Sequence, residues 1–193
     1  CNTETFDVTP YAKATAFYLL GHRDTQDFGR KFKIAFSGCK DEACALVSMH
    51  DLGGIAAERE ENGRTVRGFE LYVGGGLGAV PHQAKLMIEF CPEEDLLPTA
   101  RAIGRVFART GEKKNRNRAR LKFVVQKLGI DEFRRLVEEE MKTMPEDPSW
   151  RTFFDEIKTY REPPAEKLVQ LTVAKRPPGY DAWEATNVYA QRQ

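Results

Sequence analysis

The feature that most constrains the fold is a change in the spacing of apolar residues near Glu93. Before this point apolar and polar residues alternate in several segments, which is typical of β-strands. After it, apolar residues recur every three or four positions, which is typical of amphipathic helices. A chain with its strands first and most helices later is expected to form an α+β fold, with a mixed β-sheet and packed helices, rather than a regular doubly wound sheet.

The strand pattern is clearest around the dipeptide Asn62-Gly63. Asn-Gly between two extended segments is a strong signal for a β-hairpin, because both residues tolerate positive φ. In the second arm Phe69, Leu71 and Val73 would share one face. The expected strands are residues 31–37, 54–60, 67–73 and 85–90.

The helical pattern dominates the second half of the chain. Thr9 followed by Pro10 predicts a helix start with a capping hydroxyl, and Gly21 and Gly129 are expected to end helices. The expected helices are residues 10–20, 96–107, 121–128, 133–141 and 150–160, with a shorter helical segment near 41–49. Paired prolines punctuate the remainder, so we expect one domain over residues 1–160 and an extended tail or linker over 161–193, with one short strand near 168–173.

Composition indicates an ordinary globular protein, with 41% hydrophobic and 31% charged residues and a formal net charge of +1. The first ten residues have no secretory pattern, and no apolar run approaches the roughly 20 residues of a membrane span. We therefore expect a cytoplasmic protein without a membrane partner, and reduced thiols at its four cysteines rather than two disulfides. Both ends are expected to be cuts within a longer polypeptide.

Lys31 and Lys33 are the first candidate functional residues. On a strand, residues i and i+2 point the same way about 6.6 Å apart. Phe32, Ile34 and Phe36 would occupy the opposite, core-facing side, so two ammonium groups would project together from an anchored strand. Such a pair suits an anion. A solvated edge-strand face explains the same pattern and is favoured by the pattern alone.

A glycine run, Gly74-Gly75-Gly76-Leu77-Gly78, follows the predicted hairpin. Consecutive glycines let backbone N–H groups approach an anionic ligand closely. With Ala79 the run matches the weak dinucleotide-binding pattern, but Pro81 stands where the phosphate-binding helix should begin. A tight structural turn is an equally good interpretation.

Residues 99–127 form a strongly basic segment, with ten basic residues and Glu112 as their only acid. Its net charge is +9, so the rest of the chain carries −8. Arg101, Arg105 and Arg109 repeat every four residues opposite the apolar stripe and are expected to form a solvated face, while Glu138-Glu139-Glu140 could neutralise some of the charge. Nucleic acid is the generic partner of such a segment, but no nucleic-acid motif or interleaved aromatic residue supports it. A ligand with several carboxylates fits equally well.

Cys39 and Cys44 form a close pair that could hold a metal or an iron–sulfur cluster. One pair supplies only two thiolates where a closed site needs four ligands, so buried or unligated thiols are favoured. We find no nucleophile–base pair and no carboxylate pair with catalytic spacing. The sequence therefore shows no self-contained active site.

Four segments in order carry a resemblance to a known family. They are Arg30-Lys31-Phe32-Lys33-Ile34, residues 73–78, residues 115–123 and residues 129–134 with the Val137-Glu138 that follows. From about Phe6 to Glu140 the chain resembles the siroheme and 4Fe-4S domain of nitrite and sulfite reductases. The resemblance implies a polypeptide of two related halves, each pairing a ferredoxin-like segment with one such domain. In that family the second copy carries the cluster cysteines as C-x5-C and C-x3-C pairs. The C-x4-C spacing here implies the first, non-cluster copy, with Cys1, Cys39 and Cys44 as weak candidates for cluster ligands.

The resemblance also implies roles for individual residues. Lys31 and Lys33 would reach the nitrite or sulfite bound at the siroheme iron, stabilise it and supply protons. Facing the siroheme carboxylates would be Arg30, Gly74, Gly75, Gly76, Arg116, Arg118, Arg120 and Lys122.

The implied reaction is a six-electron reduction of nitrite to ammonia or of sulfite to sulfide. Its electrons would come from a 4Fe-4S cluster in the other half and from a donor such as ferredoxin or a flavoprotein. The isolated chain is then expected to be inactive. The alternatives are a module that binds nucleic acid or another polyanion through residues 99–127, and a purely structural repeat.

Overall fold

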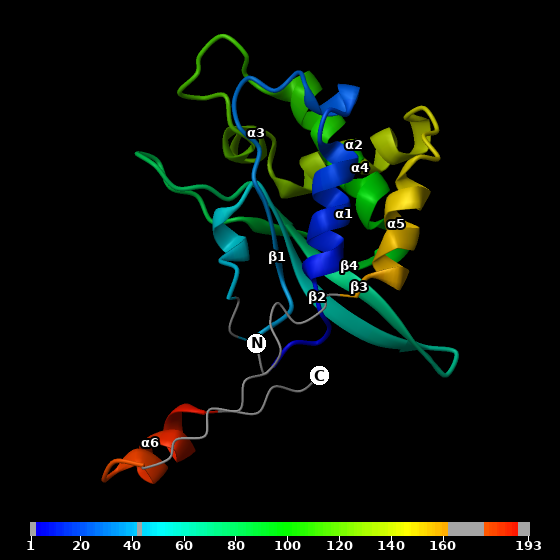
Figure 1. Ribbon diagram of the computed structural model, residues 1–193. Helices are drawn as coiled ribbons and strands as arrows, with labels where there is room; N and C mark the ends of the chain where they lie inside the picture. The colour runs from blue at the N-terminus through cyan, green and yellow to red at the C-terminus, as the bar shows by residue number, and fades with distance from the viewer. Residues whose placement is uncertain (1–2, 42–43, 162–175, 189–193) are drawn as a thin grey trace.

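The computed structural model describes residues 3–41, 44–161 and 176–188. Its centre is a four-stranded sheet in the order β1-β2-β3-β4, drawn in Figure 1. The strands are β1 (Ile34–Ser37), β2 (Leu52–Glu61), β3 (Arg64–Val73) and β4 (Lys85–Pro92). β1 pairs with β2 in parallel, whereas β2–β3 and β3–β4 are antiparallel. The predicted α+β fold with a mixed sheet is confirmed.

The predicted hairpin is β2 and β3. Asn62 and Gly63 form its two-residue loop with φ values of 51° and 74°, which is the backbone that a primed turn requires. Glu61 pairs with Arg64 directly beside the loop, so the pairing extends further than the alternation alone predicts.

Six α-helices are described, with short 3₁₀ turns between some elements. They are α1 (Thr9–Leu19), α2 (Leu96–Thr110), α3 (Leu121–Leu128), α4 (Ile130–Thr143), α5 (Trp150–Thr159) and α6 (Tyr180–Asn187); the 3₁₀ turns are η1 (Arg23–Thr25), η2 (Val47–Met49) and η3 (Glu93–Asp95). None of the helices in the described part of the chain is long and apolar enough to span a membrane.

Three expectations about elements need correction. In the described part of residues 41–49 only η2 is helical. The Thr9 hydroxyl does not cap α1; instead the Asp7 carboxylate accepts the Thr9 N–H at 2.8 Å. The tail contains α6, so the tail is not extended throughout. This helix buries no residue, and its Asp181 and Glu184 form ion pairs with Arg176. The strand expected at 168–173 lies outside the described residues, and the domain boundary near residue 160 stays a prediction.

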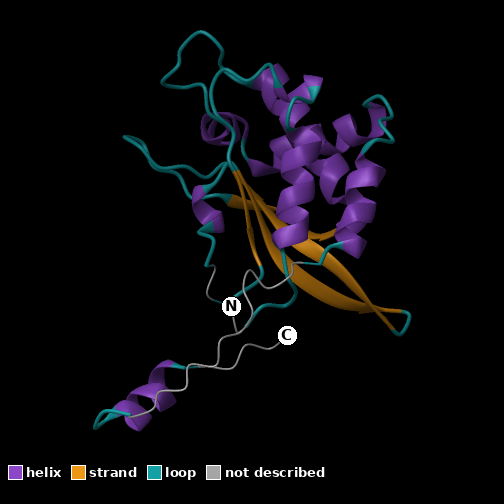
Figure 2. Ribbon diagram, in the orientation of Figure 1, coloured by secondary structure: helices purple, strands orange, loops and turns teal. Residues whose placement is uncertain are grey.

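Helices α1, α2, α4 and α5 gather on one face of the sheet, as Figure 2 shows. At the centre of this layer Phe69 of β3 is fully buried, and its ring lies 5.0 Å from that of Tyr11 and 5.4 Å from that of Phe36. Leu71 and Val73 share its complete burial, so the predicted face of β3 is confirmed as core.

The arginines of α2 do not form the expected solvated face. Arg101 is only 2% exposed, and its Nε donates to Asp24 Oδ2 at 2.7 Å. Arg105 bridges Asp24 and Glu140 at 2.8 and 2.6 Å, and Arg109 binds the other oxygen of Glu140 at 2.5 Å. The expectation was wrong because η1 and α4 pack on this side of α2 and bring one acid each.

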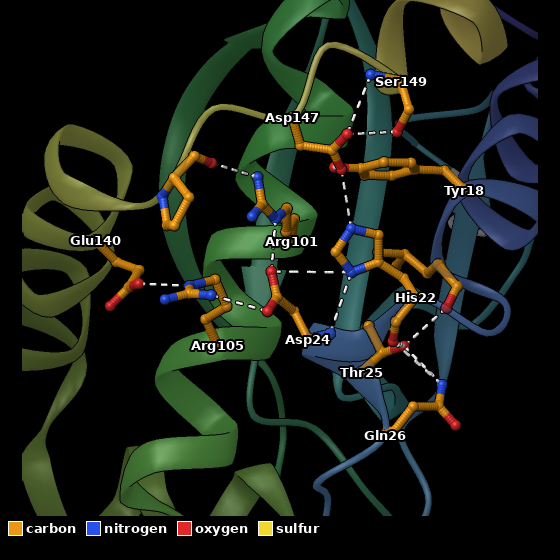
Figure 3. A network of polar contacts seen from close by, with 12 residues as sticks. Tyr18, His22, Asp24, Thr25, Gln26, Arg101, Arg105, Glu140, Asp147 and Ser149 are labelled. Carbon is orange, nitrogen blue, oxygen red and sulfur yellow. Dashed lines mark hydrogen bonds and ion pairs between the residues drawn. The ribbon is translucent and has the colours of Figure 1, made fainter.

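Figure 3 shows how this ion-pair network continues to the loop before α5. His22 Nε2 lies 2.9 Å from Asp147 Oδ2, and the Tyr18 hydroxyl donates to the same oxygen at 3.1 Å. The Ser149 N–H donates to the other Asp147 oxygen at 3.1 Å. The network therefore connects the end of α1 to the start of α5.

Candidate anion and cofactor site

The paired lysines lie just before β1 rather than within it. The strand begins at Ile34, three residues later than the alternation predicts. Lys31 and Lys33 are nevertheless both exposed, while Phe32 between them packs against the core with its ring 6.0 Å from that of Phe107. The predicted alternation of side chains therefore holds even though the strand assignment does not.

The reason for the late strand start is Asp51, the residue before β2. Its Oδ2 accepts the Lys33 N–H at 2.9 Å, so this donor binds a side chain rather than a neighbouring strand. The Lys33 carbonyl accepts the Leu52 N–H at 3.1 Å, which keeps the lysine segment alongside β2.

Arg120 approaches the same carboxylate from the loop between α2 and α3. Its Nε donates to Asp51 Oδ1 at 3.1 Å and its Nη2 to Oδ2 at 2.7 Å, and the Asp51 side chain is fully buried. Such a fork-shaped pair fixes direction as well as distance. Two of the arginine's donor nitrogens therefore already bind a protein carboxylate. Its predicted contact with siroheme stays untested.

The glycine run packs tightly against the chain before β2. The N–H groups of Gly74 and Gly75 donate to the carbonyls of Asp51 and His50, and Gly76 exchanges two hydrogen bonds with His82, all at 2.9 Å. A Cβ on Gly75 would lie only 2.5 Å from the Ser48 carbonyl oxygen. Backbone packing thus accounts for the glycines, and these three N–H groups already have acceptors within the protein. No helix follows the run, which removes the structural basis of the dinucleotide interpretation.

Lys122, on the first turn of α3, holds the loop that the glycine run opens. Its ammonium donates to the carbonyls of Leu77 and Val80 at 3.0 and 2.5 Å. A Cβ on Gly76 would lie 3.1 Å from Lys122 Cδ and 3.3 Å from Arg120 Nη2. Gly76 therefore brings the main chain directly over these two basic side chains.

The remaining predicted cofactor contacts lie on the loop between α2 and α3. The Arg30 guanidinium donates to the Arg116 carbonyl at 3.4 Å, which places the lysine segment beside this loop. Arg116 and Arg118 are exposed, and the Arg118 guanidinium lies 5.8 Å from the centre of the Phe123 ring. In Figure 1 the glycine-run loop leaves the sheet between β3 and β4, and the other loop joins α2 to α3.

The concentration of positive charge affects the lysines themselves. The charge of Lys33 is the main influence that lowers the pKa of the Lys31 ammonium, followed by loss of hydration and by the charges of Arg120 and Arg30; Asp51 opposes them. Burial lowers the pKa of Lys122, and the charge of Arg120 adds to the effect. A lowered pKa makes an ammonium group a readier proton donor.

The cysteines that can be placed do not form a cluster site. Cys39 and Cys91 are buried free thiols, and Cys44 is exposed. Burial raises the pKa of the Cys91 thiol to about 12, which disfavours the thiolate that a metal needs. Within the described residues no group of three or more potential ligands is positioned to hold a metal. Cys1 lies outside the described residues.

Much of the site was predicted residue by residue, but its central acid was not. The structure brings together Arg30, Lys31, Lys33, Gly76, Arg120 and Lys122. Asp51 gave no signal beyond being a single acid three residues before the strand expected at residues 54–60. Its partners lie 18 and 69 residues away, so no local pattern connects them to it.

Comparison with known proteins identifies the family. The family model described as the nitrite and sulphite reductase 4Fe-4S domain matches residues 1–144. The chain belongs to this family. Members of the family use siroheme and a 4Fe-4S cluster.

This reductase domain has curated relatives of several kinds. It is 31% identical over 137 residues to sulfite reductase (ferredoxin) 1 of Mycolicibacterium paratuberculosis, covering 71% of the chain and 24% of that protein. It is 34% identical over 113 residues to the assimilatory ferredoxin-dependent nitrite reductase of Haloferax mediterranei, covering 58% and 19%. It is 37% identical over 131 residues to the sulfite reductase (NADPH) hemoprotein beta-component of Methylorubrum populi, covering 64% and 21%.

Solved structures give the same result. The Mycobacterium tuberculosis NirA protein matches the reductase domain with a TM-score of 0.64 and 31% identity, over 75% of this chain and 26% of that one. A dissimilatory sulfite reductase I matches with a TM-score of 0.52 and 12% identity, which supports the fold alone. The chain thus spans about a quarter of the length of the relatives it matches.

Proposed function

We propose that this chain forms the anion-binding part of a siroheme-dependent nitrite or sulfite reductase, and that it is inactive by itself. The observation that carries the proposal is the convergence of Lys31 and Lys33 with Arg30, Arg120 and Lys122 from two segments that lie far apart in the sequence. Cations held this close repel one another, so an anionic ligand stabilises the arrangement. The family membership makes nitrite or sulfite, with siroheme, the ligands of choice.

The two lysines would bind the substrate oxyanion and supply protons to its oxygens as they leave as water. Both ammonium groups are exposed on one side of an anchored segment, so they can reach the same oxyanion. The lowered pKa of Lys31 suits it to proton donation. Siroheme, when bound, would supply the iron and relay the electrons, which the donor provides through the 4Fe-4S cluster.

The exposed arginines Arg116 and Arg118, together with Arg30, would bind the carboxylates of siroheme. Arg30 already lies against the loop that carries the other two, so the three guanidinium groups can act on one polyanionic ligand. Guanidinium–carboxylate pairs are charge-assisted and often bidentate. Lys122 and Gly76 would contribute by fixing the loop through which the chain approaches the ligand closely.

The 4Fe-4S cluster would be held by a second, related domain of the same polypeptide rather than by this one. The described thiols form no ligand set, and the buried Cys91 resists ionisation. The electron donor would be ferredoxin or a flavoprotein, since the curated relatives are named as ferredoxin- or NADPH-dependent reductases. A cytoplasmic location remains a prediction from the sequence.

The proposal is tested by Lys31→Ala and Lys33→Ala in the full polypeptide that contains this chain. Each is expected to lower turnover by about 100-fold or more, since a positioned proton donor contributes roughly 10² to 10⁴. The unfolding midpoint should stay unchanged because both side chains are exposed. Lys142→Ala, an exposed lysine of α4, is the matched control and should keep full activity. Normal turnover in both lysine variants would contradict the proposal and favour a purely structural repeat.

The polyanion-binding alternative has less charge available than the sequence suggests. Five of the ten basic residues between 99 and 127 pair with carboxylates of the folded domain. They are Arg101, Arg105, Arg109, Lys113 and Arg120. Salt-sensitive binding of single- or double-stranded nucleic acid that is lost in Arg116→Gln would restore this alternative.

A further inference from the structure

Asp51 joins three segments that are far apart in the sequence. Its buried carboxylate accepts the Lys33 N–H and two donors of Arg120, and its main-chain carbonyl accepts the Gly74 N–H at 2.9 Å. The lysine segment, the glycine run and the loop before α3 therefore meet at one residue. Such a junction fixes the relative positions of three segments that are far apart in the sequence.

We propose that Asp51 is the positioning residue of the anion site, holding the main chain of the paired lysines at Lys33 and the guanidinium of Arg120 beside them. The inference rests on the proposed function, because it assigns Asp51 to the site in which Lys31 and Lys33 bind the oxyanion. A catalytic group must be held close to its working geometry, and a displacement of about 1 Å can cost two orders of magnitude in rate.

A buried ion pair can also be simply structural, and apolar residues often replace one without loss of stability. Two observations favour positioning here. The Asp51 oxygen that binds Arg120 Nη2 also binds the N–H of one of the two lysines, so the pair and the lysine segment share an acceptor. The charges of Asp51 and Arg120 also act on the Lys31 ammonium, one raising and one lowering its pKa. Asp51 thus fixes the main chain at Lys33 and contributes to the pKa of Lys31.

The experiment is Asp51→Asn in the full polypeptide, with Asp24→Asn as the matched control. Asp24 is also a shielded acid that binds two arginines, but it lies in the network between η1, α2 and α4. An asparagine at 51 keeps the shape but replaces one acceptor oxygen with a donor that faces Arg120 or the Lys33 N–H. Two quantities are measured: the dissociation constants of nitrite and sulfite, and amide hydrogen exchange in peptides that cover residues 31–37.

The expected result for Asp51→Asn is at least tenfold weaker oxyanion binding together with faster exchange at the Lys33 amide. Asp24→Asn should lower the unfolding midpoint but leave oxyanion binding within twofold. Equal loss of oxyanion binding in both variants, or unchanged binding and exchange in Asp51→Asn, would overturn the inference.

Arg120→Lys provides a second route if Asp51→Asn does not fold. It keeps a positive charge near Asp51 but loses the two-point contact, so oxyanion binding should weaken in the same direction and by a smaller factor. Unchanged binding in this variant would overturn the inference.

Lys33→Ala in the same titration separates the two proposals. If it leaves oxyanion binding intact, the proposed function fails. If it abolishes binding while Asp51→Asn does not weaken it, only the positioning role fails.

Discussion

Arg101 lies in α2 with only 3% of its side chain exposed, and it binds both Asp24 and the Pro145 carbonyl. Replacing it with methionine keeps much of the volume but leaves the Asp24 carboxylate with one arginine instead of two. Removing one partner of a buried pair typically costs about 3–5 kcal/mol. Because Arg105 remains, we expect Arg101→Met to lower the free energy of unfolding by about 3 kcal/mol, near the bottom of that range. Urea unfolding measures this loss of stability.

Arg135 of α4 is the matched control for this prediction. It makes ion pairs with Glu132 and Glu139, as Arg101 does with Asp24, but all three side chains are largely open to solvent. Exposed pairs on a helix contribute little. Arg135→Met should therefore leave the urea midpoint where it is, and a loss equal to that of Arg101→Met would show that burial is not the deciding factor.

The same residues show where prediction from the sequence stops. Spacing correctly predicted that Lys31 and Lys33 alternate with core residues within one short segment, although that pattern alone favoured a solvated face; their assignment to an anion site came from the family resemblance and stays a prediction. Spacing misjudged Arg101, Arg105 and Arg109, since their partners Asp24 and Glu140 are supplied by other elements. An i,i+4 repeat describes one helix face and contains no information about what packs on that face.

At the scale of elements, Lys122 connects α3 to the loop of the glycine run. We expect Lys122→Met to leave α3 intact but to speed amide exchange at Gly76 and His82, whose paired hydrogen bonds close the loop. The reason is that the carbonyls of Leu77 and Val80 lose their common donor. Hydrogen-exchange mass spectrometry measures the exchange rates of these two amides, and Lys127→Met, at the exposed end of α3, is the control. Unchanged exchange would mean that the loop is held by backbone bonds alone.

Elements with a strong local signal were predicted well. Asn62-Gly63 located the β2–β3 hairpin, and Gly129 located the end of α3. Elements whose bounds depend on distant partners were predicted less well. β1 starts late because the Asp51 carboxylate accepts the Lys33 N–H. Within the described residues 44–49 the only helical structure is a 3₁₀ turn, where the chain packs against β2 and the glycine run.

For the whole molecule, the ion-pair network of Figure 3 predicts sensitivity to acid. Burial raises the pKa of Asp24, but hydrogen bonding to Arg101 and the charge of Arg105 lower it more, and the net pKa is lowered. The pKa of Glu140 is lowered in the same way, because its hydrogen bonds to Arg105 and Arg109 outweigh the effect of burial. Burial raises the pKa of Asp147, but its hydrogen bonds to Ser149 and His22 lower that pKa strongly overall.

A carboxyl whose pKa is lower in the folded state stabilises the fold above its unfolded pKa of about 4, and this contribution is lost as the pH falls through the folded value. We therefore expect the free energy of unfolding to decrease steadily below about pH 4. Asp147→Asn should flatten this decrease because it removes one of the titrating groups. Denaturant unfolding between neutral and strongly acidic pH tests it, and an equally steep decrease in the variant would contradict the assignment.

The share of the relatives that the chain covers leads to a prediction about cofactor content. Purified from cells supplied with siroheme, the full polypeptide should show siroheme absorption bands and iron, and this chain alone should show neither. The reason is that this chain provides positive side chains on one side of the ligand but no described metal ligand set. Bands in both samples would show that this copy binds siroheme unaided, whereas bands in neither would contradict the reductase proposal.

The wide sequence separation of the site residues has a consequence for biosynthesis. Lys31 and Lys122 are joined by a segment that a ribosome needs roughly 5–20 seconds to make, at common synthesis rates of about 5–20 residues per second. The β2–β3 hairpin can form as soon as it emerges, because its contacts are local. The ion pair between Asp51 and Arg120 can form only after the loop before α3 has been made. The proposed siroheme contacts at Arg116 and Arg118 depend on the same loop. Under the proposed function, loading of siroheme would follow the docking of α3, so incorporation of the pigment would report that the anion site has been assembled.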